Sequence, residues 1–474
     1  MTIKNIAACI GLMLAVGCES TEPASCTVVC STDAECPEGQ TCGELGRCTA
    51  GRACPCTAGE VLGCADATSV RVCNAAGNGL EMQSCGAVGC NFAANRCNEC
   101  TPNVASCTDA NTVQVCGDDG AIANEETCAM GCATSPAAHC RYVSPAYMPD
   151  VCDELAPDDD LVISALTTID TSADASCSAI VAQTSGPPIC VVRHRRIDIQ
   201  AAGVLRAIGT RPLALVADDE LLVTGKIDVG ARAAENGAGG GTSASGALAY
   251  FTAASTMGTA GGGAGFRHVG GFGGGGETGG GILDPSPTTT GFIGGPKNGG
   301  GGGGALALIA CRGTVTMPGT IQAGGGGGPA GTTRTGPLGN VQVRGGSGGG
   351  AGGFVIIEGA QVSVTGGIFA NGGGGGAGCG TSGSIACGGP GQDGYAALTA
   401  AAPGHAPNGN FCDGGAGGTV SAPVSGNCSS DIGTCGGGGG AAGRIRVYAP
   451  AGVTATTTGV TSPPIDTPLV VPTR

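Results

Sequence analysis

The sequence predicts a mainly β protein, in which small disulfide-rich modules precede a right-handed parallel β-helix with long glycine-rich loops. Two observations carry this prediction: most cysteines lie before residue 153 and most glycines after it, and one phrase recurs at 222–230, 316–324 and 363–372. Each copy follows a short apolar run and precedes a glycine-dominated tract. Segments this short cannot bury a face alone, but when stacked ~4.8 Å apart they share one apolar interior. We expect one coil to take roughly 20 to 25 residues.

Residues 1–17 have the pattern of a secretory signal: a charged start, an apolar run and small residues before Cys18. The run is too short to span a bilayer. Leu14–Cys18 resembles a bacterial lipobox, so Cys18 is the predicted lipid attachment site and 18–25 a tether. The alternative is an ordinary signal peptide with an incidental cysteine. Glu19 in place of aspartate favours the outer membrane and the cell surface over a periplasmic or secreted location.

The cysteines before residue 141 fall into three modules, at 26–54, 56–97 and 100–140. The last two are copies of one repeat, because their cysteine spacings and the residues between them agree. Modules of this size need disulfides to hold together. We expect three bridges in each repeat and leave the 15 possible connectivities open. The disulfide candidates of the repeats are Cys56, Cys64, Cys73, Cys85, Cys90, Cys97, Cys100, Cys107, Cys116, Cys128, Cys132 and Cys140.

A metal site is the alternative reading of these cysteines. Zinc prefers closely spaced cysteine pairs, usually with histidine. Cys97 and Cys100 form one such pair, and His139 is the only histidine near them in the sequence. An exported chain favours disulfides instead, so we expect no metal and no cofactor.

Residues 141–160 are acidic and contain prolines, and we interpret them as a linker or as the capped start of the β domain at 161–474. A calcium site is the alternative, but no spaced acidic loop with a glycine is present. Cys177 and Cys190 are predicted to bridge near the entrance to the β domain. Without Cys9 and Cys18, 27 of the 29 cysteines remain, so one thiol is free or pairs outside the chain.

Three tracts, at 230–304, 324–353 and 372–443, are too rich in glycine to carry a core. Ordering each glycine costs roughly 0.5–1 kcal/mol more than ordering alanine. The tracts are therefore either disordered or packed backbone to backbone, and we expect partly ordered loops on one side of the coil. Aromatic residues that could dock the loops are Phe266, Phe272, Phe292, Tyr395 and Phe411. Cysteines that could staple the last loop are Cys379, Cys387, Cys412, Cys428 and Cys435.

Charge and composition exclude some classes of function. The net charge is −15 and the chain has three lysines, so no basic patch is present to hold a nucleic-acid backbone. Tryptophan is absent and aromatic residues make up 3%, which argues against stacking platforms for bases or sugars.

No convincing catalytic motif is present, and we predict no catalytic site. Gly345–Gly349 matches a nucleophile elbow around Ser347 only because glycine runs match many motifs. Gly388–Asp393 matches a single calcium-binding nonapeptide, a kind of site that needs tandem copies. His194 lies in a cationic run that we interpret as a solvated face. A β-helix lyase would need acidic groups and a base on adjacent coils, for which the candidates are Asp228, Arg312 and Glu358.

The lipobox occurs together with the Cys30-to-Cys42 pattern C-x5-C-P-x-G-Q-x-C, the cysteine repeats and the blocks at 307–313 and 438–447. In these features the chain resembles cysteine-rich, glycine-rich surface lipoproteins of myxobacterial type with a pectin-lyase-like second half. The resemblance implies an address on the outer surface and carries over no activity.

We therefore expect a lipid-anchored surface protein with a structural, adhesive or binding role. Its expected partners are the membrane, through the N-terminal lipid, and extracellular polysaccharide or other surface proteins. Alternatives are a polysaccharide-acting β-helix enzyme and a calcium-dependent adhesin.

Overall fold

The computed structural model describes residues 26–44, 46–51, 54–153, 157–241, 248–249, 251–253, 259–380, 385–407, 412–428, 434–466 and 469–474. The signal sequence and Cys18 lie outside these residues. The described chain is mainly β, as predicted, with short 3-10 turns at η1 (Asp33–Glu35), η2 (Gly86–Val88) and η3 (Asp174–Ser176). No helix in the described ranges is long and apolar enough to cross a membrane.

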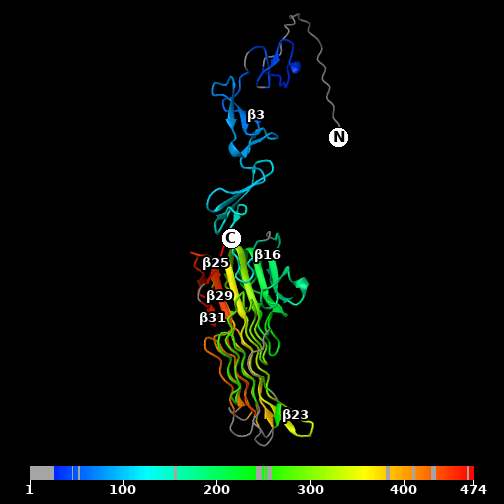
Figure 1. The fold of residues 1–474 in the computed structure, drawn as a ribbon, viewed down its shortest axis with the longest axis vertical. Helices are drawn as coiled ribbons and strands as arrows, with labels where there is room; N and C mark the ends of the chain where they lie inside the picture. The colour runs from blue at the N-terminus through cyan, green and yellow to red at the C-terminus, as the bar shows by residue number, and fades with distance from the viewer. Residues whose placement is uncertain are drawn as a thin grey trace, which may run out of the picture. The chain divides into compact units, whose positions relative to one another are not determined.

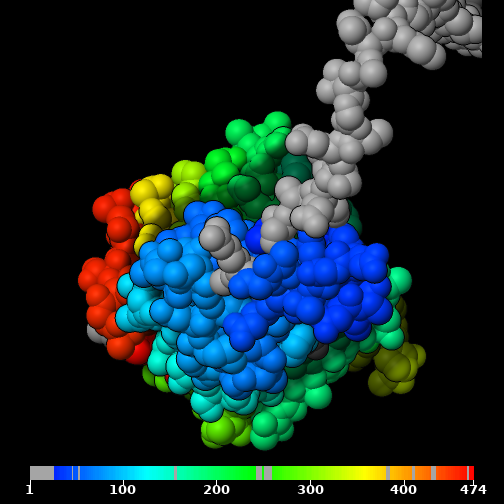
Figure 2. All heavy atoms as spheres, turned by 90° about the horizontal axis from the view of Figure 1, so that it is seen from above, coloured from blue at the N-terminus to red at the C-terminus, as the bar shows by residue number. Residues whose placement is uncertain are grey.

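The cysteine-rich modules consist of small antiparallel sheets joined by tight turns. Their atoms are the blue to cyan spheres in Figure 2. Valines on the central strand of the first repeat, Val70 and Val72, are buried beside Cys85. This small core follows from the alternation of apolar and polar residues in that strand. The strands are β1 (Thr41–Cys42), β2 (Cys48–Thr49), β3 (Val61–Asp66), β4 (Ser69–Cys73), β5 (Leu80–Ser84), β6 (Cys90–Asn91), β7 (Arg96–Cys97), β8 (Ala105–Cys107), β9 (Thr112–Cys116), β10 (Ile122–Thr127), β11 (Cys132–Ala133) and β12 (His139–Cys140).

The disulfides supply the connectivity that the spacing left open. In the first repeat the first cysteine pairs with the third, the second with the fifth and the fourth with the sixth. The second repeat has the same first-to-third and fourth-to-sixth bridges, and Cys107 and Cys132 are also disulfide-bonded. The module at 26–54 has the bridges Cys26–Cys54, Cys30–Cys42 and Cys36–Cys48. This density of bridges indicates an oxidising, extracellular or envelope location.

The chain forms two compact units. The first holds the residues up to Thr108 together with Val113–Glu126 and Pro136–Ala138, and the second holds the remainder, including His139–Arg474. The two parallel sheets and the glycine tracts belong to the second unit, which is described below by itself.

Two long parallel sheets, consistent with a β-helix, form the upper part of the second unit in Figure 1. The nine-stranded sheet contains β13 (Asp160–Ile163), β15 (Ala179–Val181), β16 (Ile189–Ile199), β18 (Leu213–Val223), β21 (Ala305–Met317), β25 (Phe354–Val364), β29 (Arg444–Ala449), β30 (Thr456–Thr457) and β32 (Leu469–Val470). The six-stranded sheet contains β14 (Leu166–Asp170), β17 (Val204–Ile208), β19 (Lys226–Asp228), β22 (Thr320–Gln322), β26 (Gly367–Phe369) and β31 (Val460–Ser462).

The three copies of the recurring phrase lie side by side, as the sequence predicts. Leu222 is aligned with Thr316, and Thr316 with Ser363, on neighbouring parallel strands. Cys190 is aligned with Leu213, a step of 23 residues that agrees with the expected coil length. Later coils are longer because a glycine tract follows β19, β22 and β26 of the six-stranded sheet.

The nine-stranded sheet buries both of its faces along the first half of each long strand. One face contributes to a core shared with the six-stranded sheet, containing residues such as Leu215, Leu308 and Ile357. The opposite face, with Val216, Ile309 and Ile356, lies under a second apolar cluster. Burial on both faces explains why these half-strands read as continuous apolar runs rather than as alternating patterns.

Residues 142–152 supply part of that second cluster, which favours the capped start of the β domain over a solvated linker. Val143 and Cys152 are fully buried. A disulfide ties Cys152 to Cys311 of β21, and Tyr142 exchanges backbone hydrogen bonds with Arg474 at the C-terminus. We call residues 142–152 the strap, because they cross the outer face of the nine-stranded sheet.

The described parts of the glycine tracts pack backbone to backbone, the second of the two alternatives that composition allowed. Within 346–353, every third amide donates to the same neighbouring segment. The amides of 346, 349 and 352 donate to the carbonyls of 435, 438 and 441, respectively. The amides of 347, 350 and 353 donate instead to the carbonyls of 329, 326 and 323. This period of three is that of the polyproline II helix, which has no internal hydrogen bonds and turns successive amides in different directions. Each tract therefore bonds to several neighbours. In Figure 1 the tracts form a bundle that runs from the sheets toward β23.

We call this network of backbone hydrogen bonds between glycine tracts the lattice. The close approach of neighbouring tracts explains why its positions are glycine. A Cβ atom on Gly350 would lie 1.9 Å from the carbonyl oxygen of Gly301. The corners between the two sheets obey the same rule, since a Cβ on Gly366 would lie 1.9 Å from the oxygen of Gly319. The corner glycines are therefore required by the close stacking of neighbouring coils.

Some of the aromatic residues predicted to dock the loops are buried and others are exposed, and most of the cysteines predicted to staple the last loop form disulfides. Phe266 and Phe292 are fully buried in the outer cluster, whereas Phe272 and Tyr395 are 49% and 40% exposed. Phe411 lies outside the described residues. Two bridges staple the last loop, Cys379–Cys387, between β27 (Cys379–Gly380) and β28 (Ala386–Cys387), and Cys428–Cys435. Cys412 is a buried thiol.

The end of the bundle away from the sheets carries a small antiparallel sheet of β20 (Phe251–Ala253), β24 (Val341–Arg344) and β23 (Thr332–Thr335). We call residues 332–344 the tip hairpin. All four residues of β23 are exposed, and Leu338 in the connecting turn is 93% exposed. The bundle thus presents an accessible hairpin at its end.

Candidate functional site

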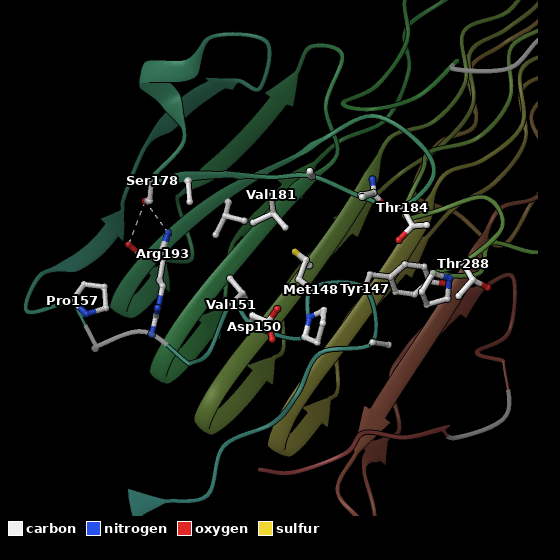
Figure 3. A pocket seen from close by; sticks show the side chains of 17 residues that line it. Tyr147, Met148, Asp150, Val151, Pro157, Ser178, Val181, Thr184, Arg193 and Thr288 are labelled. Atoms are coloured by element: carbon white, nitrogen blue, oxygen red, sulfur yellow. Dashed lines mark hydrogen bonds between the residues drawn. The ribbon is translucent and has the colours of Figure 1, made fainter. Parts of the chain in front are cut away.

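A pocket lies on the outer face of the nine-stranded sheet, shown in Figure 3. Its volume is about 690 Å³. The strap forms one wall, residues 178–184 around β15 form a second, and Pro287 and Thr288 from the first glycine tract complete the rim. Val191 and Arg193 of β16 lie at its floor.

The strap is held in place by prolines and by contacts along its length. Pro145 begins a turn in which the Met148 amide donates to the Pro145 carbonyl. The Tyr147 hydroxyl donates to the Pro285 carbonyl at 2.7 Å, and its ring packs against those of Phe292 and Phe354 at centroid distances of 5.7 and 5.8 Å. Burial raises the pKa of the Tyr147 hydroxyl, so this hydroxyl remains a donor.

The opposite wall is also fixed by covalent and polar contacts. Cys177 is bridged to Cys190, as the sequence predicts, and β15 pairs antiparallel with β16. The Gln183 side chain accepts a hydrogen bond from the Phe292 amide and donates one to its carbonyl. These contacts pin the loop after β15 to the first glycine tract.

The floor of the pocket contains a buried ion pair. Arg193 Nη2 lies 2.8 Å from Asp218 Oδ1, and the two side chains are 5% and 0% exposed. The Ser178 hydroxyl accepts a hydrogen bond from the Arg193 amide at 3.0 Å, drawn as a dashed line in Figure 3. At the rim, Asp150 pairs with Arg474 at 3.2 Å. Both charged residues that line the pocket are therefore neutralised by partners outside it.

Glu358 has a different environment under the strap. It is 1% exposed, and its Oε1 accepts a hydrogen bond from the Ala146 amide at 3.3 Å. Burial raises the pKa of this carboxyl to about 8, and the Ala146 hydrogen bond opposes the rise. The side chain is therefore mostly protonated at neutral pH and acts as a neutral contact between the sheet and the strap.

The three lyase candidates do not share one register. Asp228 lies in the six-stranded sheet, aligned with Gln322, and pairs with Arg206 at 2.6 Å. Glu358 lies in the nine-stranded sheet, aligned with Ile309. Arg312 falls in the irregular stretch of β21 between two aligned segments. Strand register therefore does not bring these three candidate groups together.

The cationic run on β16 is partly exposed to solvent, as predicted, with Arg195 and Arg196 46% and 51% exposed, and it also pairs with acids. Arg195 pairs with Asp160 at 2.8 Å, Arg196 with Glu220, and His194 with Asp159 at 2.9 Å. Acidic groups in or beside the neighbouring strands β13 and β18 thus face this run.

The remaining motif residues have structural partners. Asp393 of the calcium-like nonapeptide accepts hydrogen bonds from the Ala233 and Gly327 amides, both at 2.7 Å. It therefore joins two glycine tracts. Ser347 is buried within the glycine lattice, where its backbone bonds to other tracts. It has no strand-to-helix turn to expose its hydroxyl.

The cysteine sulfurs considered for zinc are used in disulfides. Cys97 and Cys100 are bridged to Cys85 and Cys116. Within the described part of the chain, one set of three possible metal ligands, Cys30, Cys36 and Cys42, has sulfur atoms within 4.8 Å of one another. Each of these is also bridged, and metals bind thiolates rather than disulfides.

The pocket was missed by sequence reasoning because its walls come from distant segments. One signal was available: Val143, Tyr147, Met148 and Val151 give the supposed linker more apolar side chains than a solvated segment needs.

Comparisons with known proteins add no further constraint. The chain matches no protein-family model, no curated protein and no solved structure.

Proposed function

We propose that the protein is exported, lipid-anchored through Cys18 at the cell surface, and acts there as a structural or adhesive projection. In this proposal the two sheets are faces of a right-handed parallel β-helix, and the glycine bundle is a rigid arm extending from them. The disulfide-stapled modules suit a protein that works in an oxidising environment.

The observation that carries the proposal is the hydrogen-bond lattice between glycine tracts. A lattice that bonds each tract to several neighbours resists bending more than separate loops do. It ends in the exposed tip hairpin rather than in a closed core. A chain that orders so many glycines at an entropic cost but leaves Leu338 93% exposed at the far end is well suited to presenting that end to a partner.

The tip also has charge suited to contact with acidic surfaces. The described tip hairpin contains Arg334 and Arg344 and no acidic residue, in a chain whose net charge is −15. Repulsion between two acidic bodies would therefore be weakest at the tip. Anionic extracellular polysaccharide is the partner class that this distribution favours.

The location is tested on intact cells that express the full chain. Surface proteolysis should remove the protein from wild-type cells, and Cys18→Ala should release it from the membrane fraction. Retention inside protease-resistant cells, or unchanged membrane association of the Cys18→Ala variant, would contradict the location.

The adhesive role is tested with the full-length protein on arrays of acidic and neutral polysaccharides and on whole bacterial cells. The double variant Leu338→Ser/Arg334→Ser should lower binding at least tenfold. Leu398→Ser is the matched control, since it removes a 59% exposed leucine outside the tip hairpin. Equal binding by wild type and the tip variant would refute a contact at the tip. No binding by any form would favour a purely structural role.

A further inference from the structure

We propose that the pocket between the strap and β15 is a binding site for a small, uncharged and largely apolar molecule. This site is separate from the tip hairpin, and the inference does not depend on the adhesive role. Four features of the pocket carry it: its size, its apolar walls, its compensated charges and its rigid construction.

The size and lining are those of a small-molecule site. Pockets that bind small ligands typically enclose roughly 300–1,000 Å³ and are lined mainly by apolar side chains with a few polar groups. The volume here is about 690 Å³. The apolar wall residues are Ala146, Tyr147, Met148, Pro149, Val151, Pro157, Ala179, Val181, Ala182, Val191 and Pro287.

The charges of the pocket specify an uncharged ligand. Arg193 is committed to Asp218 in a pair that is almost fully buried. An anionic ligand would have to compete with Asp218 for Arg193, and separating a buried pair costs several kcal/mol. Asp150, the one lining carboxylate, has a 79% exposed side chain at the rim and already pairs with Arg474, so it offers a cation only a solvent-screened contact.

A few polar groups set how such a ligand would lie. Thr184 and Thr288 stand together beside Tyr147 at one end of the pocket in Figure 3, and Ser178 and Arg193 mark the other end. The apolar residues Met148, Val151 and Val181 lie between these ends. A molecule with an apolar body and a hydroxyl, ether or carbonyl group at one end matches this distribution.

The walls are held before any ligand arrives. Cys152–Cys311 ties down the strap, and Cys177–Cys190 ties down the start of the loop that contains β15. Two such constraints lower the entropy that binding would otherwise cost. Ligand binding should in turn stabilise the strap by mass action.

The test uses the full chain and N-phenyl-1-naphthylamine, an uncharged apolar probe whose fluorescence rises in apolar sites. Its anionic analogue, 1-anilinonaphthalene-8-sulfonate, serves as the charged comparison. We expect saturable binding of one uncharged probe per chain and at least tenfold weaker binding of the sulfonate. Non-saturable binding of the uncharged probe, or tighter binding of the sulfonate, would overturn the inference.

Two substitutions on neighbouring residues of β15 locate the probe. Ala179 lines the pocket and Ile180 does not, because successive side chains of a strand point to opposite faces. Ala179→Trp should fill the pocket and weaken probe binding at least tenfold, whereas Ile180→Trp should leave binding within twofold of wild type. Equal affinity in both variants would place the probe elsewhere and refute the site.

Folding is checked by the melting temperature of each variant. If Ala179→Trp does not fold, Ala182→Phe makes the same test from another position on the wall. Since the wild-type chain has no tryptophan, the single tryptophan of Ile180→Trp provides a second measurement. Its fluorescence should be quenched by energy transfer to bound probe, and its persistence at saturating probe would also count against the site.

Discussion

Replacing Gly350 by alanine tests the glycine lattice at its most crowded kind of position. The added Cβ would lie 1.9 Å from the Gly301 carbonyl oxygen, whereas real Cβ atoms essentially never approach within 3.0 Å of another heavy atom. The tract at 300–302 must therefore move by about 1 Å. Gly301 accepts from the Gly326 amide, and Gly326 accepts from the Gly350 amide, so the movement disturbs both hydrogen bonds.

The expected loss follows from these contacts. Overpacking in a filled interior costs typically 1–3 kcal/mol, and each buried backbone group left without its hydrogen bond costs about 1–3 kcal/mol. Allowing for partial relaxation, we expect Gly350→Ala to lower the free energy of unfolding by about 3–5 kcal/mol. In a unit of this size that corresponds to a fall of roughly 4–7 °C in melting temperature.

Differential scanning calorimetry of the full oxidised chain measures the effect. Gly389→Ala is the matched control, because Gly389 also lies in a glycine tract and bonds to His405, yet nothing lies within 4 Å of its added Cβ. The control should melt within about 2 °C of wild type, since the added methyl restricts the unfolded chain without a clash. If the two variants melt alike, tract packing does not determine stability and the lattice account fails.

Three further substitutions test the strap and the sheet. Since the pKa of Glu358 is raised to about 8 from 4.5, wild-type stability should fall as pH rises from 4.5 to 8, and Glu358→Gln should remove roughly 4 kcal/mol of that fall; parallel pH profiles of denaturation would contradict this. Cys311→Ser removes a disulfide between cysteines 159 residues apart, whereas Cys387→Ser removes one between cysteines 8 residues apart. Cys311→Ser should therefore lower the melting temperature more, and it should expose the strap to limited proteolysis. An equal effect of the two variants would argue against the strap. Asp218→Asn should cost about 3–5 kcal/mol because it leaves a buried arginine charge, whereas Asp160→Asn at a half-exposed pair should cost under about 1 kcal/mol; equal losses in urea denaturation would show that the pocket floor is open to water.

The sheets could be predicted because their information is local and repeated. Each copy of the phrase carries the same apolar run, corner glycine and second apolar segment, so alignment of the copies fixes the register of Leu222, Thr316 and Ser363. Similar short segments bury all their apolar faces together when they are stacked as aligned parallel strands. That is why register, normally the hardest feature of a β protein to infer, was accessible here.

The glycine bundle could be predicted only as a pair of alternatives. A run of identical glycines gives no period and no face, so nothing in the sequence distinguishes residue 349 from residue 350. The two amides nevertheless donate to different tracts, at carbonyls 438 and 326. The order arises from the three-residue turn of the polyproline II backbone, a property of the chain's geometry rather than of side chains.

The pocket could not be predicted because it depends on contacts between distant residues. The strap meets β21 through Cys152 and Cys311, which are 159 residues apart, and Arg193 meets Asp218 from the next strand of the sheet. The sequence marked Arg193 as part of a solvated cationic run, since adjacent cations usually are. Its burial follows from the strap and the loop after β15 that cover this end of the sheet.

Hydrogen exchange of the glycine tracts, followed by mass spectrometry on the intact oxidised protein, tests the central claim most directly. If the tracts form the inter-tract lattice, peptides covering 345–353 and 370–378 should be protected to a degree comparable with the strands β21 and β25. Exchange of these peptides at the rate of unfolded glycine chains, while the strands remain protected, would contradict the account.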